Sequence, residues 1–224
     1  MQFGYLGVGG VGKAAYLVVL LGIFAGASVA RGAEPAEPAK SQSLFDGKSL
    51  KGWKKTAFGG EGDVDVEGGK IIMRAGNPLT GITWTGDYPR MDYEISLETM
   101  RVDGSDFFCG LTFPVGDTTC TFIVGGWGGG VIGLSSIDGS DASENETTRY
   151  QEFVSGNWHQ VRVRVTQDKI KAWLDGKQMA EVETKDRKIS IRPEVELSRP
   201  LGVSCFSTTA ALRNIKIEPF AKTK

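Results

Sequence analysis

The hydrophobic positions of the chain recur with a period of two. From Met91 to Glu98 apolar side chains alternate with polar ones, and the same alternation runs from Gln160 to Val165. Successive side chains of a strand point to opposite faces of a sheet, so this pattern is typical of half-buried strands. No window of about a dozen residues shows the 3.6-residue period of an amphipathic helix. The pattern therefore predicts an all-β domain.

Further short apolar segments are separated by glycine-rich turns. The strands predicted from them are Lys70 to Arg74, Ile82 to Thr85, Asp106 to Phe113, Thr119 to Val124, Leu201 to Phe206 and Ala210 to Ile217. Ile170 to Leu174 leads directly into Asp175-Gly176, which is typical of a two-residue hairpin turn because its glycine tolerates positive φ. Many short strands joined by such turns predict a two-sheet antiparallel β-sandwich or jelly roll.

Residues 1–30 have a different character. Lys13 precedes an uncharged stretch from Ala14 to Ala30, which ends in the small residues Ser28-Val29-Ala30. This order predicts a signal peptide over residues 1–30, cleaved near Ala30, and a secreted or periplasmic mature protein. The alternative is an uncleaved membrane anchor, because ~17 apolar residues reach the lower limit for spanning a bilayer.

The rest of the chain divides into a short linker and one domain. Residues 31–43 contain two Glu-Pro pairs and no apolar periodicity, which predicts a disordered linker. Residues 44–220 are long enough for a single domain with a proper core. The chain carries 26 basic and 27 acidic residues. This balance argues against binding to nucleic acid or to anionic lipid.

Three segments carry a resemblance to a known family. Leu44 to Trp53 reads LFDGKSLKGW, Gly156 to Lys177 forms a tryptophan-led strand and an Asp-Gly hairpin, and Arg213 to Ile217 reads RNIKI. From Leu44 to about Phe220 the chain resembles the 3-keto-disaccharide hydrolase family, formerly a domain of unknown function. The resemblance implies a concanavalin-like or laminin-G-like jelly roll whose concave face receives a sugar, in an exported bacterial protein.

The resemblance also implies a reaction. A keto group at C3 of a sugar acidifies the hydrogen at C2, so a base can remove it and the neighbouring glycosidic bond can break by elimination before water adds. Such chemistry requires a base and something that stabilises the enediolate, commonly a metal or fixed donors. The chain departs from the family between Thr121 and Trp127, where most expected polar residues are missing. The alternative is a non-catalytic glycan-binding module on the same scaffold.

The segment from Asp138 to Arg149 concentrates the candidate chemistry. Its carboxylates could bind a divalent cation such as calcium, with Asp138, Asp141 and Glu144 as the predicted ligands. The predicted catalytic carboxylates are these three and Asp106, and Asn145 and Arg149 are predicted to bind substrate. The alternative interpretation is a solvated, turn-rich acidic loop. Metal binding by two or more of these carboxylates would favour an enzyme, whereas an aromatic-lined groove without them would favour a binding module.

Trp127 stands alone in the glycine run Gly125 to Gly130. A tryptophan presented by such a backbone offers a flat apolar face to a sugar ring, and its N–H can still donate a hydrogen bond. We therefore predict Trp127 as a substrate-binding platform for a carbohydrate ligand. The alternative is a glycine-rich bend with the indole folded inward.

The single histidine and the three cysteines limit other chemistry. Because His159 is the only histidine, a multi-histidine metal site is excluded, and its place at the start of a strand favours a structural role. Cys109 and Cys120 could form a disulfide across a hairpin that turns at residues 114–117. The alternative is that these two and Cys205 are buried thiols that pack as small apolar groups.

Overall fold

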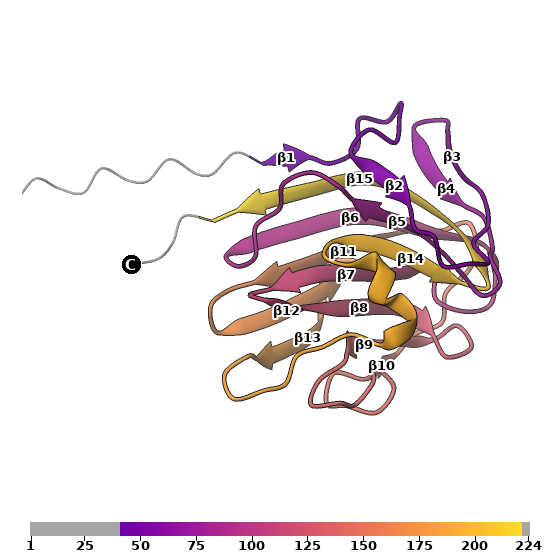
Figure 1. Ribbon diagram of the computed structural model, residues 1–224. Helices are drawn as coiled ribbons and strands as arrows, with labels where there is room; N and C mark the ends of the chain where they lie inside the picture. Colours follow the sequence, from indigo (N-terminus) through magenta and orange to yellow (C-terminus); the bar gives the residue numbers. More distant parts are fainter. Residues whose placement is uncertain (1–40, 221–224) are drawn as a thin grey trace, which may run out of the picture. The chain divides into compact units, whose positions relative to one another are not determined.

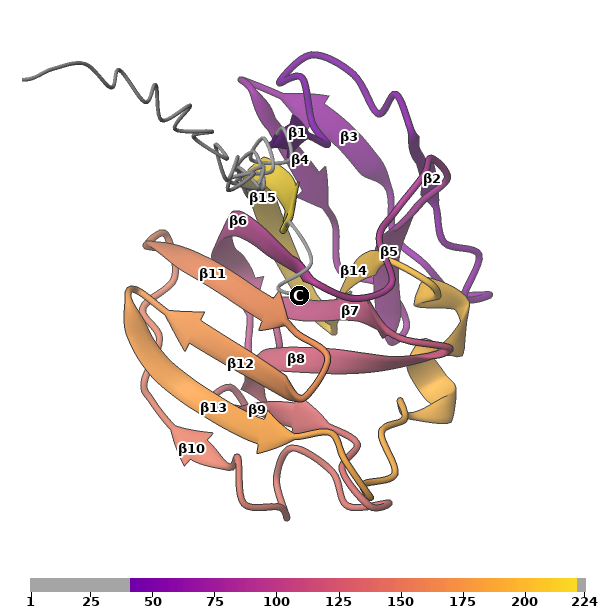
Figure 2. The same ribbon diagram turned by 90° about the vertical axis from the view of Figure 1, so that its left-hand side faces the viewer.

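The computed structural model describes residues 41–220, so the predicted signal peptide and almost all of the predicted linker lie outside the described residues. Two antiparallel sheets, here called sheet A and sheet B, pack face to face (Figure 1, Figure 2). Within residues 41–220 the only helix is one short 3₁₀ turn, η1 (Pro193–Ser198). The predicted all-β, two-sheet jelly roll is confirmed. No helix in this range has the length and apolar character needed to cross a membrane.

Sheet A runs in the order β13-β12-β11-β6-β15-β4-β3, and β1 pairs with β15. Its strands are β1 (Gln42–Ser43), β3 (Val64–Glu67), β4 (Lys70–Met73), β6 (Tyr93–Gly104), β11 (Trp158–Val165), β12 (Lys169–Leu174), β13 (Lys177–Glu183) and β15 (Thr208–Pro219). The alternation seen in the sequence is the alternation of this sheet, because Tyr93 and Ile95 are fully buried in the core whereas Glu94 is partly exposed on the outer face. Sheet A therefore has one apolar face and one polar face.

Sheet B runs in the order β10-β9-β8-β7-β14-β5-β2. Its strands are β2 (Trp53–Lys55), β5 (Leu79–Trp84), β7 (Cys109–Val115), β8 (Thr118–Gly126), β9 (Val131–Ser135), β10 (Arg149–Tyr150) and β14 (Gly202–Phe206). Every residue of β5, β7 and β9 is buried, so both faces of this sheet are covered. The cover over the outer face includes η1, which lies against β14 and β5.

Two apolar clusters follow from this arrangement. The main core lies between the sheets and includes Phe108, Phe113 and Phe122, each with no exposed surface. A second cluster includes Leu79, Phe107, Ile123, Val131, Ala142 and Val195, with Phe206 packed against it. This second cluster belongs to the covered outer face of sheet B, and it provides the apolar surroundings of the site described below.

The hairpin predictions have different outcomes. Asp175 and Gly176 have φ of 50° and 79°, which confirms the tight turn between β12 and β13. β7 and β8 also form a hairpin, but in its register Cys109 faces Val124 and Cys120 faces Phe113. Of the two interpretations left open by the sequence, the disulfide is therefore wrong and the buried thiols are confirmed, because all three cysteines are free and buried. Burial raises the pKa of each thiol to about 12.

Candidate functional site

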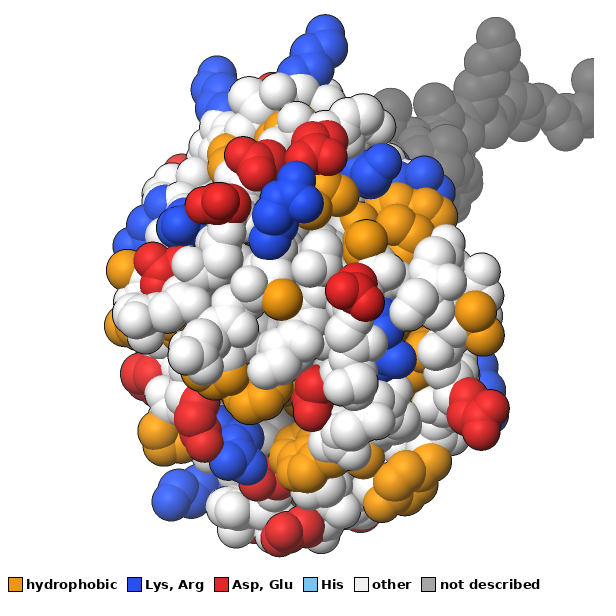
Figure 3. All heavy atoms as spheres, turned by 90° about the vertical axis from the view of Figure 1, so that its right-hand side faces the viewer, with side chains coloured by type: hydrophobic (Ala, Val, Ile, Leu, Met, Phe, Trp, Pro, Cys, Tyr) orange, Lys and Arg blue, Asp and Glu red, His pale blue; other side chains and the backbone are white. Residues whose placement is uncertain are grey.

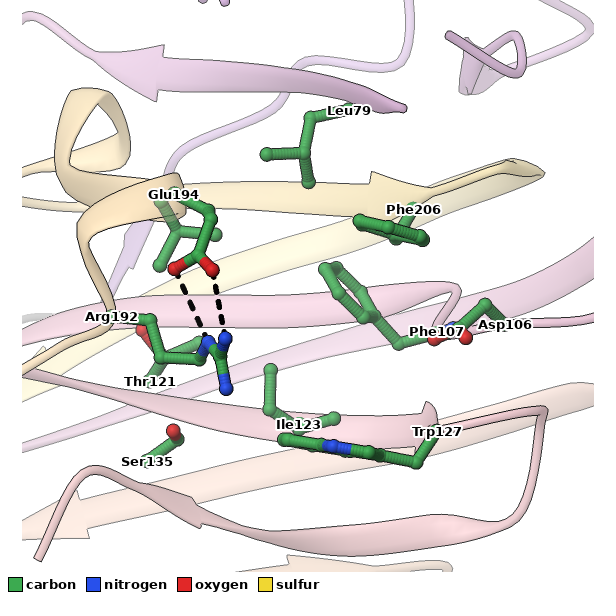
Figure 4. A pocket seen from close by; sticks show the side chains of 11 residues that line it. Leu79, Asp106, Phe107, Thr121, Ile123, Trp127, Ser135, Arg192, Glu194 and Phe206 are labelled. Carbon is green, nitrogen blue, oxygen red and sulfur yellow. Dashed lines mark hydrogen bonds and ion pairs between the residues drawn. The ribbon is translucent and has the colours of Figure 1, made fainter. Parts of the chain in front are cut away.

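A cavity of about 200 Å³ lies on the outer face of sheet B, beneath the segment that contains η1 (Figure 4). Apolar side chains from five separate parts of the chain form much of its lining: Leu79, Phe107, Ile123, Val195 and Phe206. Thr121 and Ser135 reach it from the middle of sheet B. The site is therefore an apolar hollow into which a small number of polar groups are directed.

The alternation of β8 explains how this strand contributes to both the core and the cavity. Phe122 and Val124 face the main core, so Thr121 and Ile123 face the opposite way, toward the cavity. The Thr121 hydroxyl lies 3.0 Å from the Thr112 hydroxyl of β7, which satisfies both buried groups. Most polar residues expected from the family resemblance are missing from this strand, and the polar group that β8 directs into the cavity is the Thr121 hydroxyl.

Trp127 lies in the turn between β8 and β9, and its side chain lines the cavity (Figure 4). Its φ is 49°, an uncommon value for a residue with a side chain, and the residue is 42 % exposed. The guanidinium carbon of Arg192 lies 5.9 Å from the centre of the ring. Of the two interpretations left open by the sequence, the structure favours the one in which the indole is presented to a cavity.

Asp106 is the predicted catalytic carboxylate that does line the cavity. It precedes β7, and both of its carboxylate oxygens accept backbone hydrogen bonds. Oδ1 accepts from the Phe107 N–H at 2.7 Å, and Oδ2 accepts from the Gly128 N–H at 3.0 Å. The carboxylate therefore joins the start of β7 to the turn that carries Trp127.

Arg192 and Glu194 supply the ion pair of the cavity (Figure 4). Nη2 of Arg192 donates to Oε1 of Glu194 at 2.7 Å, and Nε donates to Oε2 at 3.2 Å. Nη1 donates to Asp141. The hydrogen bonds from Arg192 hold the pKa of Glu194 below its usual range, so Glu194 is a charged hydrogen-bond acceptor and a weak base. Asp141 meets the site through Arg192 and does not itself line it.

The remaining carboxylates of the predicted metal site form ion pairs elsewhere. Asp138 lies 2.5 Å from Nε of Arg187 and accepts a bond from the Lys188 N–H at 2.7 Å, and these contacts lower its pKa. Glu146 binds the same arginine at 2.6 Å. Residues 41–220 contain no group of three or more His, Cys, Asp or Glu side chains placed to hold a metal ion. Asp138, Asp141 and Glu144 thus do not form the predicted ligand set.

The predicted substrate-binding residues of this loop serve its internal structure. The Asn145 amide donates to the Leu134 carbonyl at 2.8 Å, and its oxygen accepts from the Thr147 N–H at 2.9 Å. Arg149 donates to the Thr148 carbonyl at 2.7 Å. Glu144 is exposed. Asn145, Arg149, Asp138 and Glu144 do not line the cavity.

One feature of the sequence could have drawn attention to Arg192. A basic stretch, residues 185–192, follows the acidic loop at a distance of some 40 to 50 positions, and its arginines bind that loop through Asp138, Asp141 and Glu146. Opposite charge in two segments favours their contact but does not determine it. Glu194 has no such signal, because its role depends on the turn that begins at Pro193.

Apolar side chains are also exposed outside the cavity. Val102 lies near the end of β6, Tyr150 lies in β10 opposite Val131, and Val154 lies in the loop before β11. Figure 3 views the end of the sandwich that lies on the right of Figure 1, where apolar side chains stand among charged and polar ones. Together with Trp127, these residues are four of the five large hydrophobic residues that are exposed within residues 41–220.

Comparison with known sequences identifies one family. The sequence profile of the 3-keto-alpha-glucoside-1,2-lyase-like domain matches residues 40–218, which is most of the chain. This match confirms the resemblance inferred from the three sequence segments. No curated protein matches the chain.

Comparison with solved structures identifies the same fold in carbohydrate-related proteins. A putative glycosyl hydrolase from Parabacteroides distasonis is 15 % identical, with a TM-score of 0.53 over 81 % of this chain and 94 % of that one. A laminarinase from Flavobacterium is 14 % identical, with a TM-score of 0.53 over 83 % and 100 %. A Crh5 transglycosylase in complex with NAG is 12 % identical, with a TM-score of 0.53 over 83 % and 88 %. At these identities the likeness shows a shared fold.

Proposed function

The chain belongs to the family of 3-keto-alpha-glucoside-1,2-lyase-like domains, a family of carbohydrate-active domains, and we propose that it binds a carbohydrate in the cavity beside Trp127. The observation that carries the proposal is the half-exposed indole at an apolar hollow that also contains Arg192 and Glu194. A sugar ring has an apolar face that stacks on an aromatic ring and an edge of hydroxyls that both donate and accept hydrogen bonds. Trp127 can stack on the apolar face, and Arg192 and Glu194 can form hydrogen bonds with the hydroxyls.

The polar groups of the cavity suit hydroxyls better than anionic ligands. Arg192 is neutralised by Glu194 and by Asp141, and Asp106 adds a further carboxylate, so the cavity presents donors and acceptors without excess positive charge. The volume of about 200 Å³ lies below the range of about 300–1,000 Å³ that is usual for drug-sized ligands. We therefore expect one sugar unit, or the end of a chain, to occupy it.

Cleavage of 3-keto-glycosides is a second candidate function, and the family match supports it. A base would take the proton from C2 to give an enediolate, whose electrons would form the C1–C2 double bond as the glycosidic oxygen leaves and takes the proton from the base; water would then add across that double bond. Asp106 and Glu194 are the carboxylates that line the cavity, and Glu194 is a weak base because Arg192 lowers its pKa. Asp106, whose carboxylate accepts backbone hydrogen bonds and forms no salt bridge within residues 41–220, would then be the base, and Arg192 would stabilise the enediolate. No step is assigned to a metal, because the described carboxylates do not form a ligand set.

Export of the protein is part of the same proposal. The apolar stretch from Ala14 to Ala30 and the small residues at its end support cleavage of a signal peptide. A glycan-directed domain would then meet its ligands outside the cytoplasm. Detection of a mature N-terminus at Arg31 in the secreted or periplasmic fraction would test this part directly.

The binding proposal is tested by calorimetry with a panel of mono- and oligosaccharides, including 3-keto-sugars. Trp127→Ala is expected to weaken binding by roughly 30-fold or more, since loss of a dominant aromatic contact costs about 2 kcal/mol or more. Trp173→Ala removes a tryptophan from the outer face of sheet A and is the matched control, expected to keep the wild-type affinity. Equal affinity of the two variants would contradict the proposal.

The catalytic candidate needs a separate measurement. Release of sugar from 3-keto-disaccharides is followed by NMR for the wild type and for Asp106→Asn, with and without a chelator. If Asp106 is the base, the variant should lose turnover by a factor of roughly 100 to 10,000, a much larger effect than the loss of sugar affinity that a weakened contact with Gly128 would cause, and the chelator should have little effect. Binding without turnover in the wild type would leave the glycan-binding module as the function.

A further inference from the structure

Arg101 is a buried arginine that points from β6 into the interior of the sandwich, and only 7 % of it is exposed. Its Nη2 donates to three backbone carbonyls: Gly129 at 2.9 Å, Asp106 at 3.2 Å and Gly125 at 3.5 Å. Gly125, near the end of β8, and Gly129, in the turn that follows, lie on either side of Trp127 in the sequence. The remaining carbonyl belongs to Asp106, whose carboxylate binds the same turn. Arg101 therefore contacts the turn of Trp127 from inside the molecule.

The surroundings of Arg101 are not those of an ordinary ion pair. Within residues 41–220 it forms no salt bridge, and its Nε is buried without a hydrogen-bond partner. The guanidinium instead lies 5.1 Å from the ring centre of Phe108 and 5.9 Å from that of Phe153. A buried charge without a salt bridge is costly even where a carboxylate, here that of Asp106, is near enough to favour it electrostatically, and an apolar side chain would fill the same space with less loss. Packing alone does not account for an arginine here.

The glycines of the turn fit around this guanidinium. A Cβ on Gly125 would lie 2.8 Å from Nη2 of Arg101, and a Cβ on Gly129 would lie 3.3 Å from the same atom and 2.8 Å from the Ser105 carbonyl. Their φ values are 80° and 111°, which glycine adopts readily. The glycine run on either side of Trp127 thus allows its backbone carbonyls to approach the arginine.

We infer that Arg101 is a positioning residue for the carbohydrate platform, because its guanidinium holds the turn in the one conformation that presents Trp127 to the cavity. Asp106 holds the same turn from the other side, through its bond from the Gly128 N–H. With both contacts in place the strained φ of Trp127 is maintained before the ligand arrives, so binding does not have to order the turn. The inference rests on the proposed function for the role of Trp127, but its structural part can be measured without a ligand.

The test uses ¹⁹F NMR of protein labelled with 5-fluorotryptophan, which has one signal for each of the five tryptophans. Trp127→Phe assigns the Trp127 signal. In Arg101→Met this signal should shift and broaden while the other four keep their positions, and sugar affinity should fall roughly tenfold. Arg101→Lys retains the charge and should give an intermediate shift and an intermediate affinity. Arg213→Met removes an arginine from the outer face of sheet A and should leave the Trp127 signal unchanged.

Each outcome decides the inference. An unchanged Trp127 signal in folded Arg101→Met overturns it, as does a general change of all five signals in both Arg101 variants, which would make Arg101 a residue of the fold as a whole. If instead Trp127→Ala keeps full sugar affinity, the proposed function fails while the ¹⁹F result still reports on the turn. The two failures are therefore distinguishable.

Discussion

The two outer faces of the sandwich both place arginine beside tryptophan, but in different ways. On sheet A the guanidinium carbons of Arg213 and Arg162 lie 4.0 Å and 3.9 Å from the ring centres of Trp158 and Trp173. On sheet B the corresponding distance from Arg192 to Trp127 is 5.9 Å. Arg213 and Arg162 are in close contact with their tryptophan rings, whereas Arg192 is not.

The carboxylates that hold each arginine account for the difference. Glu98 binds Arg213 and Glu94 binds Arg162 across neighbouring strands of sheet A, so each guanidinium stays in the plane above the sheet and over its ring. Arg192 is held by Glu194, two residues further along its own segment, and by Asp141 of the acidic loop. The position of the carboxylate therefore decides the contact. A carboxylate on the neighbouring strand holds the guanidinium over the indole ring, here called a closed face, whereas carboxylates elsewhere hold it away from the ring and leave the ring available to a ligand, here called an open face.

The largest expected difference between the faces concerns the two arginines themselves. Arg192→Met should weaken sugar binding roughly tenfold, because hydrogen bonds to a charged group contribute about 1.5–3 kcal/mol and 1.4 kcal/mol is a factor of ten. Arg162→Met is the same change beside Trp173 and should leave sugar affinity unaltered. Calorimetry on the two variants measures the difference directly, and equal losses would mean that the cavity is not the binding site.

Most of the fold could be predicted because apolar residues recur with a period of two in the sequence, which is the period at which side chains alternate between the faces of a strand. Strands with one buried face, such as β6 and β11, alternate in polarity and were found. β9 was missed: its sequence VIGLS does not alternate, so only a short apolar run marks it, which is the weaker signal that did identify the equally buried β7. η1 was missed because six residues are too few for a helical period to be recognised.

The candidate site was only partly predictable, for a different reason. Trp127 and Asp106 could be proposed because each is chemically distinctive within its own segment, and both line the cavity. The carboxylates of the acidic loop were equally distinctive, but what they do is decided by Arg187 and Arg192, whose positions depend on the tertiary fold. Arg101 was missed because a strand sequence does not indicate that one of its side chains contacts the backbone carbonyls of a distant glycine-rich segment.

A smaller effect is expected on lowering the pH. Arg192 holds the pKa of Glu194 below its usual value of 4.5, so the ion pair is complete above that pH and is lost as the pH falls through the lowered pKa. Sugar affinity should stay constant from neutral pH down to about 5 and then fall several-fold in more acidic solution. Glu194→Gln should remove this acid dependence. A fall that begins near neutral pH would instead point to a group other than Glu194.

The smallest effect is expected on sheet A, where the same chemistry contributes only to stability. Hydrogen bonds from Asn214 and Arg213 lower the pKa of Glu98, so this cluster is also complete above pH 4.5. Because the pair is partly solvated, Arg213→Met should reduce the free energy of unfolding by no more than about 1 kcal/mol, measured by urea denaturation at pH 7. Sugar affinity should not change, since the stack of Arg213 on Trp158 is on the opposite sheet from the cavity. A measurable loss of affinity in this variant would contradict the division between a closed face and an open one, because it would mean that the sheet A stack is energetically coupled to the cavity of sheet B.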